Sequence, residues 1–388
     1  MIFLGLAGNY SARDIFRHSF TLGSRKDYDA LEAELVKRYG GKVETSSLTF
    51  SGRTAIAVAL DSMVVARLLK KGDHVAINGF TCYAVVEAIK HVGLKPVYLD
   101  LEKIMENAIL PNFSANALDA AASADPKLKA VIIQNTFGFP ADIRAIEKVS
   151  KAHHLLMIED LAHCAGRKYP DGREMGTVGD ATCLSFGKGK AIDTILGGAV
   201  ILRNPELSLP NSFDKSQLSR KQHTDGDAPR VSWYPLFGAI ARGLTHLHLE
   251  RFWLGLLLKL KWIERSGDTK IRYDKTITDW QAKLALRQVK LLKNSALREF
   301  YLVDNREECL KELKRHGAHL EEFWYETPIA PKRFYEKAKY KEADCPNAVF
   351  FAKHVVNLPT WYKTGRRKKQ LAKAKTIVKS HELKGSAK

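Results

Sequence analysis

A carboxylate and an amine, each at the end of a predicted buried strand, are the residues of this chain best placed to do chemistry. Asp160 follows the apolar run 155–158 and Glu159, and Lys190 follows a second short strand over 181–186. Chemistry on pyridoxal phosphate (PLP) needs such a pair, because an amine forms a Schiff base with the cofactor and an anion keeps its pyridine nitrogen protonated. The pair predicts a PLP-dependent enzyme.

The spacing of these two groups adds support. Asp160 and Lys190 are 30 positions apart, with a turn at 169–172 and the strand 181–186 between them. Two neighbouring strands of one sheet can then present both groups at the same edge. The elements that position them are therefore expected to be strands of a common sheet.

At these positions the chain resembles the DegT/DnrJ/EryC1/StrS family of sugar aminotransferases, within the fold type I PLP enzymes. The resemblance rests on Glu159-Asp160-Leu161-Ala162-His163, and on Ser185-Phe186-Gly187-Lys188-Gly189-Lys190 followed by Gly197-Gly198. In that family the first run supplies the partner of the pyridine nitrogen, and the second supplies the Schiff-base lysine. The family's spacing of five positions from Ser to Lys selects Lys190 over its competitor Lys188.

The resemblance also implies which residues bind the cofactor. His163 stands where the family has Gln or His and is expected to donate a hydrogen bond to the ring oxygen, although a histidine beside an apolar strand can also be a satisfied core residue. Asp160 would hold the pyridine nitrogen. The residues expected around the phosphate are Ser185, Gly52, Arg53 and Thr54.

The start of a predicted helix supplies the phosphate site. Ser51-Gly52-Arg53-Thr54 opens an apolar helix expected over 55–69, and the free backbone N–H groups and the dipole of a helix start favour an anion. The family usually has Ser-Gly-Thr-Ala here, whereas this chain has Arg53 at the Thr position and Thr54 one place later. Arg53 would either add charge at the phosphate or point to solvent.

Alternating helix and strand patterns predict βαβ units. Helices are expected over 27–39, 81–92 and 277–292, and strands over 74–77, 95–100 and 130–134. Asp142, after Pro140-Ala141, is predicted to cap a helix rather than to catalyse. The family's aromatic stacking position is held by Cys82, so Phe80 or Tyr83 is expected to stack on the cofactor ring, and either would also suit the core.

The fold class that the resemblance implies is α/β. We expect a fold type I PLP-dependent transferase, with a large domain holding a mainly parallel seven-stranded sheet between helices and a small C-terminal α/β domain. The 388 residues, 45% of them hydrophobic, can bury such a core. The expected domains are 1–274, including a divergent aromatic and basic insertion at about 210–266, then 275–365, and a basic tail over 366–388.

The family forms its site between two subunits, so a homodimer is expected. The usual Asn-containing loop that reaches the partner's phosphate is replaced here by Arg272-Tyr273-Asp274. Arg272 or Lys270 is our hypothesis for the substitute contact. The residue that takes the place of the Asn is left open by the sequence.

The formal net charge of +19 is concentrated at the end of the chain, where residues 353–388 carry eleven Lys and Arg against one acid. Such a run would attract an anionic membrane surface or nucleic acid, or would form a solvated terminal helix. No nucleic-acid-reading motif accompanies it, so nucleic acid is the weaker expectation. The aromatic and basic segment 231–263 suits a peripheral membrane contact, a dimer interface or a lid.

Several classes of protein are disfavoured. The five cysteines show neither disulfide nor zinc spacing, so no metal is expected and a reducing cytosol is the expected home. The N-terminal residues do not read as a signal peptide, and no run has the roughly 18 to 20 apolar residues of a membrane span. The predicted location is the cytoplasm, with a peripheral position at the inner face of a membrane left open.

The predicted reaction is amino transfer, with glutamate as the family's usual donor and a keto sugar, linked to a nucleotide, as acceptor. Surface polysaccharide or related sugar biosynthesis is the expected setting. Family members with His in place of the lysine run dehydrations, so Lys190 favours aminotransfer. A PLP-dependent dehydratase or lyase, and a non-catalytic member of the fold, are the alternatives.

Overall fold

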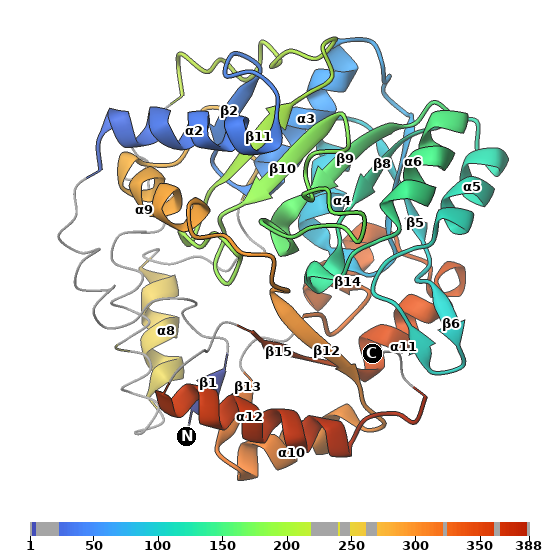
Figure 1. The fold of residues 1–388 in the computed structure, drawn as a ribbon, viewed down its shortest axis with the longest axis vertical. Helices are drawn as coiled ribbons and strands as arrows, with labels where there is room; N and C mark the ends of the chain where they lie inside the picture. The colour runs from blue at the N-terminus through green and yellow to red at the C-terminus, as the bar shows by residue number, and fades with distance from the viewer. Residues whose placement is uncertain are drawn as a thin grey trace. The chain divides into compact units, whose positions relative to one another are not determined.

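The computed structural model describes residues 2–4, 23–218, 240, 249–260, 270–320, 324–360 and 365–385. The chain forms two compact units (Figure 1). Unit 1 comprises Met1–Leu6, Arg67–Asp180 and Lys293–Lys388. Unit 2 comprises Ala7–Ala66 and Ala181–Leu292.

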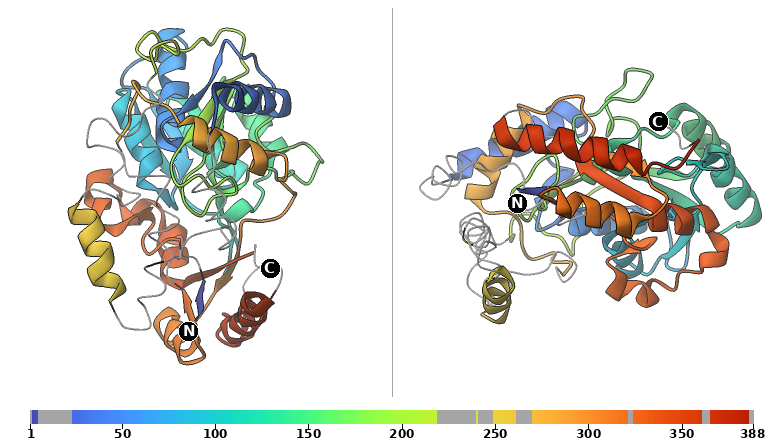
Figure 2. Two further views of the ribbon diagram at one scale, coloured as in Figure 1. Left: turned by 90° about the vertical axis from the view of Figure 1, so that its left-hand side faces the viewer. Right: turned by 90° about the horizontal axis from the view of Figure 1, so that it is seen from below.

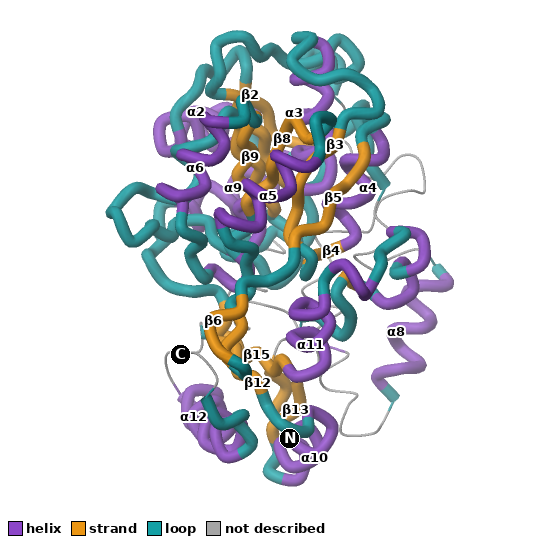
Figure 3. Tube along the Cα trace, turned by 90° about the vertical axis from the view of Figure 1, so that its right-hand side faces the viewer, coloured by secondary structure: helices purple, strands orange, loops and turns teal. Residues whose placement is uncertain are grey.

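Four parallel strands form the centre of unit 1. They lie in the order β9, β8, β3, β5. Strands β9, β8 and β3 are largely buried, as expected of strands covered on both faces, whereas β5 is only partly buried. Helices connect them in a strand-helix-strand rhythm, with α5 and α6 on one side and α4 on the other (Figure 3). The bounds are β3 His74–Asn78, α4 Tyr83–His91, β5 Lys95–Leu99, α5 Ala115–Ala124, β8 Leu128–Ile133, α6 Ile143–Ala152 and β9 Leu156–Asp160.

Two local predictions in unit 1 have clear outcomes. Asp142 is the N-cap of α6, and its side chain accepts a hydrogen bond from Ala145 N–H (3.1 Å), so the predicted cap is confirmed. The helix predicted over 81–92 begins only at Tyr83, and that start is a correction. Thr81–Cys82 instead forms the short strand β4, which pairs with β14 (Ile329–Ala330), because a distant segment supplies its hydrogen-bond partners.

The C-terminal part of unit 1 has its own hydrophobic cluster. Strand β12 (Arg298–Leu302) pairs antiparallel with β15 (Val355–Pro359), and helices α10 (Arg306–Arg315) and α12 (Gly365–Ser380) lie side by side (Figure 2). Much of the segment predicted as a basic tail is therefore a packed helix. The α12 residues that it buries in this cluster are Leu371, Ala374, Ile377 and Val378. The remaining elements nearby are β1 (Ile2–Leu4), parallel to β13 (Ala318–Leu320), the hairpin β6 (Lys103–Met105) with β7 (Ala108–Ile109), and α11 (Pro346–His354).

Unit 2 combines an antiparallel sheet with several helices. Its strands lie in the order β2 (Ser46–Thr49), β11 (Gly198–Leu202), β10 (Ala181–Ser185). Helix α3 (Gly52–Val65) packs against β10 and β11, and it ends four residues before the predicted end at 69. Helices α2 (Arg25–Tyr39) and α9 (Asp279–Val289) pack against each other. With the parallel strands of unit 1, these elements give the predicted α/β class with a mainly parallel central sheet.

The aromatic and basic segment 231–263 is described in part. Its Trp233, Tyr234, Phe237 and Trp262 lie outside the described residues. Helix α8 (Glu250–Lys259) presents the exposed side chains of Phe252 and Leu256 and buries Leu257. No helix within the described ranges is long and apolar enough to cross a membrane.

Candidate active site

The start of α3 forms a close-packed cradle in unit 2. A Cβ atom at Gly52 would lie 2.6 Å from Ser185 Cβ and 2.9 Å from its Oγ, so a side chain there would collide with the end of β10. A Cβ at Gly198, the first residue of β11, would lie 2.8 Å from Gly52 N. Glycine at both positions lets the helix start, Ser185 and β11 approach one another.

Hydrogen bonds fix the first turn of α3. Ser51 is the N-cap, its Oγ accepting from Thr54 N–H (3.2 Å). Thr54 is fully buried, and its Oγ1 accepts from Arg272 N–H (3.3 Å). Arg53 is 6% exposed, which excludes the alternative that it points to solvent.

A tight turn presents Lys190. Its N–H donates to Gly187 C=O (3.2 Å), and Gly189, the third residue of the turn, has a φ of +74°, where glycine is favoured. A Cβ on Gly187 would lie 3.9 Å from Lys190 Cγ and 3.4 Å from Ser185 Oγ, so both side chains lie next to Gly187. Lys188 is the second residue of the same turn, and its N–H donates to Ile195 C=O (3.2 Å). Unit 2 therefore brings Lys190, Ser185 and Gly52 together.

The other predicted cofactor residues belong to unit 1, where β9 ends in Glu159 and Asp160. Glu159 is fully buried and accepts N–H hydrogen bonds from Gly176, Val178 and Gly179 at 2.7 to 2.8 Å. Tyr169 Oη also donates to it (2.8 Å). The first residue of the Glu-Asp pair is therefore a structural anchor for the loop after β9.

Asp160 has a different environment. Its Oδ1 accepts from Ala162 N–H (3.0 Å) and caps the short 3-10 turn Leu161–His163, and the residue is 5% exposed. A buried carboxylate at the end of a strand is what the predicted pyridine contact requires. The role of Asp160 in holding a cofactor stays a prediction.

His163 is held by contacts to both ring nitrogens. Phe137 N–H donates to His163 Nδ1 (3.1 Å), which fixes the proton of the neutral ring on Nε2, 3.2 Å from Tyr325 Oη. Burial raises the pKa of Tyr325 well above its ordinary value, so Tyr325 keeps its own proton. The ring of Trp324 stacks on His163 with centroids 4.6 Å apart. These contacts match the core alternative for His163, and its bond to a cofactor stays a prediction.

Neither aromatic residue expected to stack on the cofactor is singled out by its surroundings. Phe80 is fully buried and packs within unit 1 against the rings of Phe137, Tyr325 and Phe351, at centroid distances of 5.0 to 6.0 Å. Tyr83 stacks on Phe334 at 4.8 Å. Both rings therefore serve the core. The sequence analysis did not single out Trp324, because its stacking partner His163 lies far away in the chain.

The residues proposed to replace the family's Asn are also described. The Arg272 guanidinium forms a two-point ion pair with Asp274, at 2.8 and 2.7 Å, and Lys270 is exposed. The pair partly neutralises Arg272, while its backbone contacts Thr54. Their contact with a partner's phosphate stays a hypothesis.

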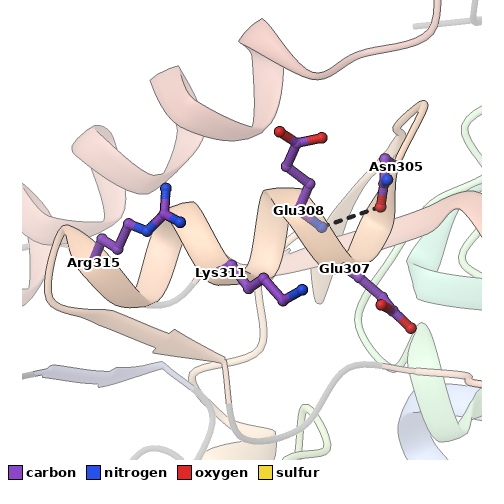
Figure 4. Close-up of a pocket in the computed structure, with 5 residues that line it drawn as sticks. All are labelled: Asn305, Glu307, Glu308, Lys311 and Arg315. Atoms are coloured by element: carbon purple, nitrogen blue, oxygen red, sulfur yellow. Dashed lines mark hydrogen bonds between the residues drawn. The ribbon is translucent and has the colours of Figure 1, made fainter.

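Other candidate sites are weak. The pocket in Figure 4 runs along α10, where Asn305 caps the helix by accepting from Glu308 N–H (3.1 Å). Its lining residues are Asn305, Glu307, Glu308, Lys311 and Arg315, all exposed. Within the part of the chain that the structure describes, no three His, Cys, Asp or Glu side chains are grouped to hold a metal ion. The five cysteines are free thiols.

The chain is similar to known proteins over much of its length. The model of the DegT/DnrJ/EryC1/StrS aminotransferase family matches residues 11–220. The chain is 24% identical over 319 residues to a pleiotropic regulatory protein of Geobacillus stearothermophilus, covering 80% of this chain and 78% of that protein. It is 27% identical over 204 residues to GDP-perosamine synthase of Escherichia coli O157:H7, covering 50% and 54% of the two chains.

The fold prediction is confirmed by solved structures. The protein Spr1654 of Streptococcus pneumoniae, in its PMP form, superposes with a TM-score of 0.67 at 17% identity, covering 97% of this chain and 99% of that one. The match places the chain in the fold of the PLP-dependent sugar aminotransferases. From the family match and the fold together, the chain belongs to the DegT/DnrJ/EryC1/StrS aminotransferase family and is a PLP-dependent sugar aminotransferase at family level.

Proposed function

We propose that this protein transfers an amino group from glutamate to a keto sugar carried on a nucleotide. The observation that carries the proposal is the packing of Ser185 against Gly52 at the start of α3, with Gly187 of the Lys190 turn next to Ser185. This places the turn that carries an amine near a helix start suited to a phosphate. An amine next to an anion site is the arrangement that PLP requires of a protein.

The residues present fit PLP. Glycine at Gly52 and Gly198 lets the start of α3 pack against Ser185 and β11, so Ser185 Oγ lies at a helix start, where backbone N–H groups favour an anion. Ser185 Oγ and the backbone of Arg53 and Thr54 would bind it. Lys190 would bind the cofactor's aldehyde carbon, and Asp160 would face its ring nitrogen.

Each of these residues has one task in the proposed reaction. PLP, when bound, supplies an electron-withdrawing ring that stabilises negative charge on a neighbouring carbon. Lys190 Nζ would accept and return a proton as a general base and acid. The Asp160 carboxylate would keep the ring nitrogen protonated. His163 would orient the ring from its oxygen side.

The substrate class rests on relatives and on charge. A relative named GDP-perosamine synthase acts on a sugar attached to GDP. The net charge of +19 suits a doubly phosphorylated substrate. We propose a nucleotide-linked keto sugar, a homodimer as in the family, and a role in surface polysaccharide or related sugar biosynthesis.

The test is the visible absorption spectrum of the purified protein with PLP, before and after glutamate is added. Wild type should show a cofactor band that glutamate bleaches, and Lys190→Ala should lack that band. A nucleotide-linked keto sugar should then restore it and yield an amino sugar. A band that glutamate leaves unchanged would point to another donor, or to the dehydratase or lyase alternative, in which product forms without an amino donor.

A non-catalytic role is the second alternative, since one relative is named a pleiotropic regulatory protein. In that case the purified protein would bind no PLP, and Lys190→Ala would behave as wild type in every assay. The presence of both Asp160 and Lys190 argues against it.

A further inference from the structure

The loop that carries Lys190 has no regular secondary structure, so its peptide groups need partners from elsewhere. It joins β10 to β11 over residues 186–197. Part of the need is met by its own backbone, because Phe186 N–H donates to Gly197 C=O (2.8 Å) and Thr194 N–H donates to Phe186 C=O (2.9 Å). The N–H groups of Gly189 and Ile195, and both backbone groups of Asp193, form their hydrogen bonds with side chains.

Asp193 joins the two arms of this loop. The residue is 1% exposed, its Oδ2 accepts from Gly189 N–H (3.0 Å), and its Oδ1 accepts from Ile195 N–H (3.0 Å). Gly189 immediately precedes Lys190. The carboxylate therefore fixes the backbone next to the lysine.

Gln288 of α9 holds Asp193 by its peptide groups. Its Oε1 accepts from Asp193 N–H (2.8 Å), and its Nε2 donates to Asp193 C=O (2.8 Å). Both halves of one amide thus pair with both backbone groups of one residue. This two-point contact sets the position and the orientation of the Asp193 backbone.

Gln281, two helical turns earlier, holds the end of the loop. It is fully buried, and its Nε2 donates to Thr194 C=O (3.1 Å) and to Leu196 C=O (2.6 Å). Its Oε1 accepts from Thr278 N–H (2.9 Å), which caps α9. Gln281 therefore ties the helix start to the loop.

The two glutamines lie on nearly the same face of α9, because residues seven positions apart in an α-helix return to almost the same face. Both bond to backbone groups of residues 193–196. This segment is bent, with Ile195 at a φ of +73°, so the two side chains hold an irregular piece of backbone against the helix.

We infer that Gln281 and Gln288, with Asp193, form a clasp that holds the Lys190 loop against α9 and so fixes the backbone from which the lysine side chain extends. The inference rests on the proposed role of Lys190 as the cofactor-binding lysine. The three are positioning residues, because their contacts are with the loop backbone. A misplacement of about 1 Å can lower a reaction rate about 100-fold, so holding this backbone matters to the amine.

The test replaces Gln288 with Leu and with Glu, with Arg287→Leu as the control. Arg287 is the exposed neighbour on the same helix. Amide hydrogen exchange of residues 187–196 is measured without cofactor, and should be about 10-fold or more faster in Gln288→Leu because two hydrogen bonds are lost. Gln288→Glu keeps an acceptor for Asp193 N–H, so its exchange should lie between the two. The control should match wild type.

A second readout follows the lysine itself. After incubation with PLP and reduction with borohydride, mass spectrometry gives the fraction of chains modified at Lys190, and absorbance gives the pH at which the cofactor band changes. In Gln288→Leu the modified fraction should fall and that pH should shift, with partial recovery in Gln288→Glu. Unchanged exchange and an unchanged modified fraction in both variants would overturn the clasp.

The two proposals fail in distinguishable ways. If wild-type Lys190 takes up no PLP, the proposed function is wrong, and the exchange measurement still decides whether the clasp exists. If wild type takes up PLP and both Gln288 variants match it in every readout, the function stands and the clasp is wrong. If Gln288→Leu does not fold, Gln288→Glu and Asp193→Asn, which each keep part of the hydrogen bonding, give the answer.

Discussion

Glu159 and Asp160 are adjacent in β9, yet their carboxylates serve different parts of the structure. Successive side chains of a strand point to opposite faces. Glu159 accepts N–H groups of the loop 176–179, whereas Asp160 caps the turn that leads to His163. The pair therefore divides into a residue that anchors the loop 176–179 and a residue that caps the turn after β9.

This division predicts opposite effects for two conservative substitutions. Glu159→Gln places an amide NH2 among N–H donors, so at least one buried donor loses its acceptor, and the free energy of unfolding should fall by about 1 to 3 kcal/mol. Asp160→Asn should leave thermal unfolding nearly unchanged and weaken PLP binding. Denaturant unfolding and a PLP titration of both variants separate the two. Equal loss of stability in both would contradict the division.

The turn that presents Lys190 predicts which lysine binds PLP. Lys190→Ala should abolish the borohydride-fixed modification, because the Lys190 stem and Ser185 Oγ both lie next to Gly187. Lys188→Ala, at the second position of the same turn, should keep it. Peptide mapping by mass spectrometry identifies the modified lysine in both variants. Modification at residue 188 in the wild type would reverse the assignment.

The cradle at α3 predicts a steric effect at Gly52. Gly52→Ala would place a Cβ 2.6 Å from Ser185 Cβ, which should destabilise the protein by roughly 1 to 3 kcal/mol and weaken phosphate-dependent PLP binding. Gly255→Ala is the control, because nothing lies within 4 Å of that position in α8, and there alanine should stabilise the helix by up to about 1 kcal/mol.

A second substitution checks that the effect comes from this contact. Ser185→Gly removes the Cβ that the new alanine meets, so the double variant Gly52→Ala with Ser185→Gly should recover part of the stability lost by Gly52→Ala alone. Denaturant unfolding of the four chains gives the coupling. Strictly additive losses would show that the collision is relieved elsewhere.

The contact between Glu312 on α10 and His381, just after α12, predicts a pH dependence. His381 Nε2 lies 2.6 Å from Glu312 Oε2, and this hydrogen bond lowers the pKa of Glu312 below its usual 4.5. A carboxyl whose pKa is lower in the folded state stabilises the fold above its unfolded pKa, and loses that stabilisation as pH falls through the folded value. The advantage of wild type over Glu312→Gln should therefore shrink below about pH 4.5.

Urea unfolding between pH 7 and pH 3.5 measures this dependence. Glu308→Gln, on an exposed position of the same helix, is the matched control for removal of one carboxylate. A constant difference between wild type and Glu312→Gln over the whole range would refute the linkage.

The exposed side of α12 predicts salt-sensitive binding to anionic vesicles. Lys375 of this helix pairs with Glu299 (2.8 Å), while four other lysines face solvent. Each basic residue near an anionic bilayer contributes about 1 kcal/mol at low salt, so wild type should sediment with phosphatidylserine vesicles at low salt and be released as salt is raised. The four lysines are Lys368, Lys369, Lys373 and Lys379.

A charge-matched control makes this test specific. Changing the four α12 lysines to Gln should abolish sedimentation, whereas changing four exposed lysines of unit 2 should leave most of it. Loss of binding in both variants would mean that net charge alone is responsible for the binding. No binding by wild type would refute the expected peripheral contact with a membrane. The unit 2 lysines are Lys26, Lys37, Lys42 and Lys290.

Local sequence patterns determined much of this protein. Apolar runs predicted the buried strands β3, β8 and β9, since a strand covered on both faces must be apolar along its length. Asp142 was predicted as a cap because the hydrogen bond that it makes is within one helical turn. The motif around Lys190 and the paired Gly197-Gly198 identified the family for the same reason: their spacing is written along the chain.

Only the tertiary structure decided which residues meet across long separations. The pairing of Thr81–Cys82 with β14, the anchoring role of Glu159, the core packing of Phe80 and the contact of Gln288 with Asp193 each join segments between 10 and 271 positions apart. Local periodicity reports which face of an element is apolar, and it carries no information on which distant segment covers that face. The sequence therefore predicted which residues take part in the chemistry, and only the fold showed which contacts hold their backbone in place.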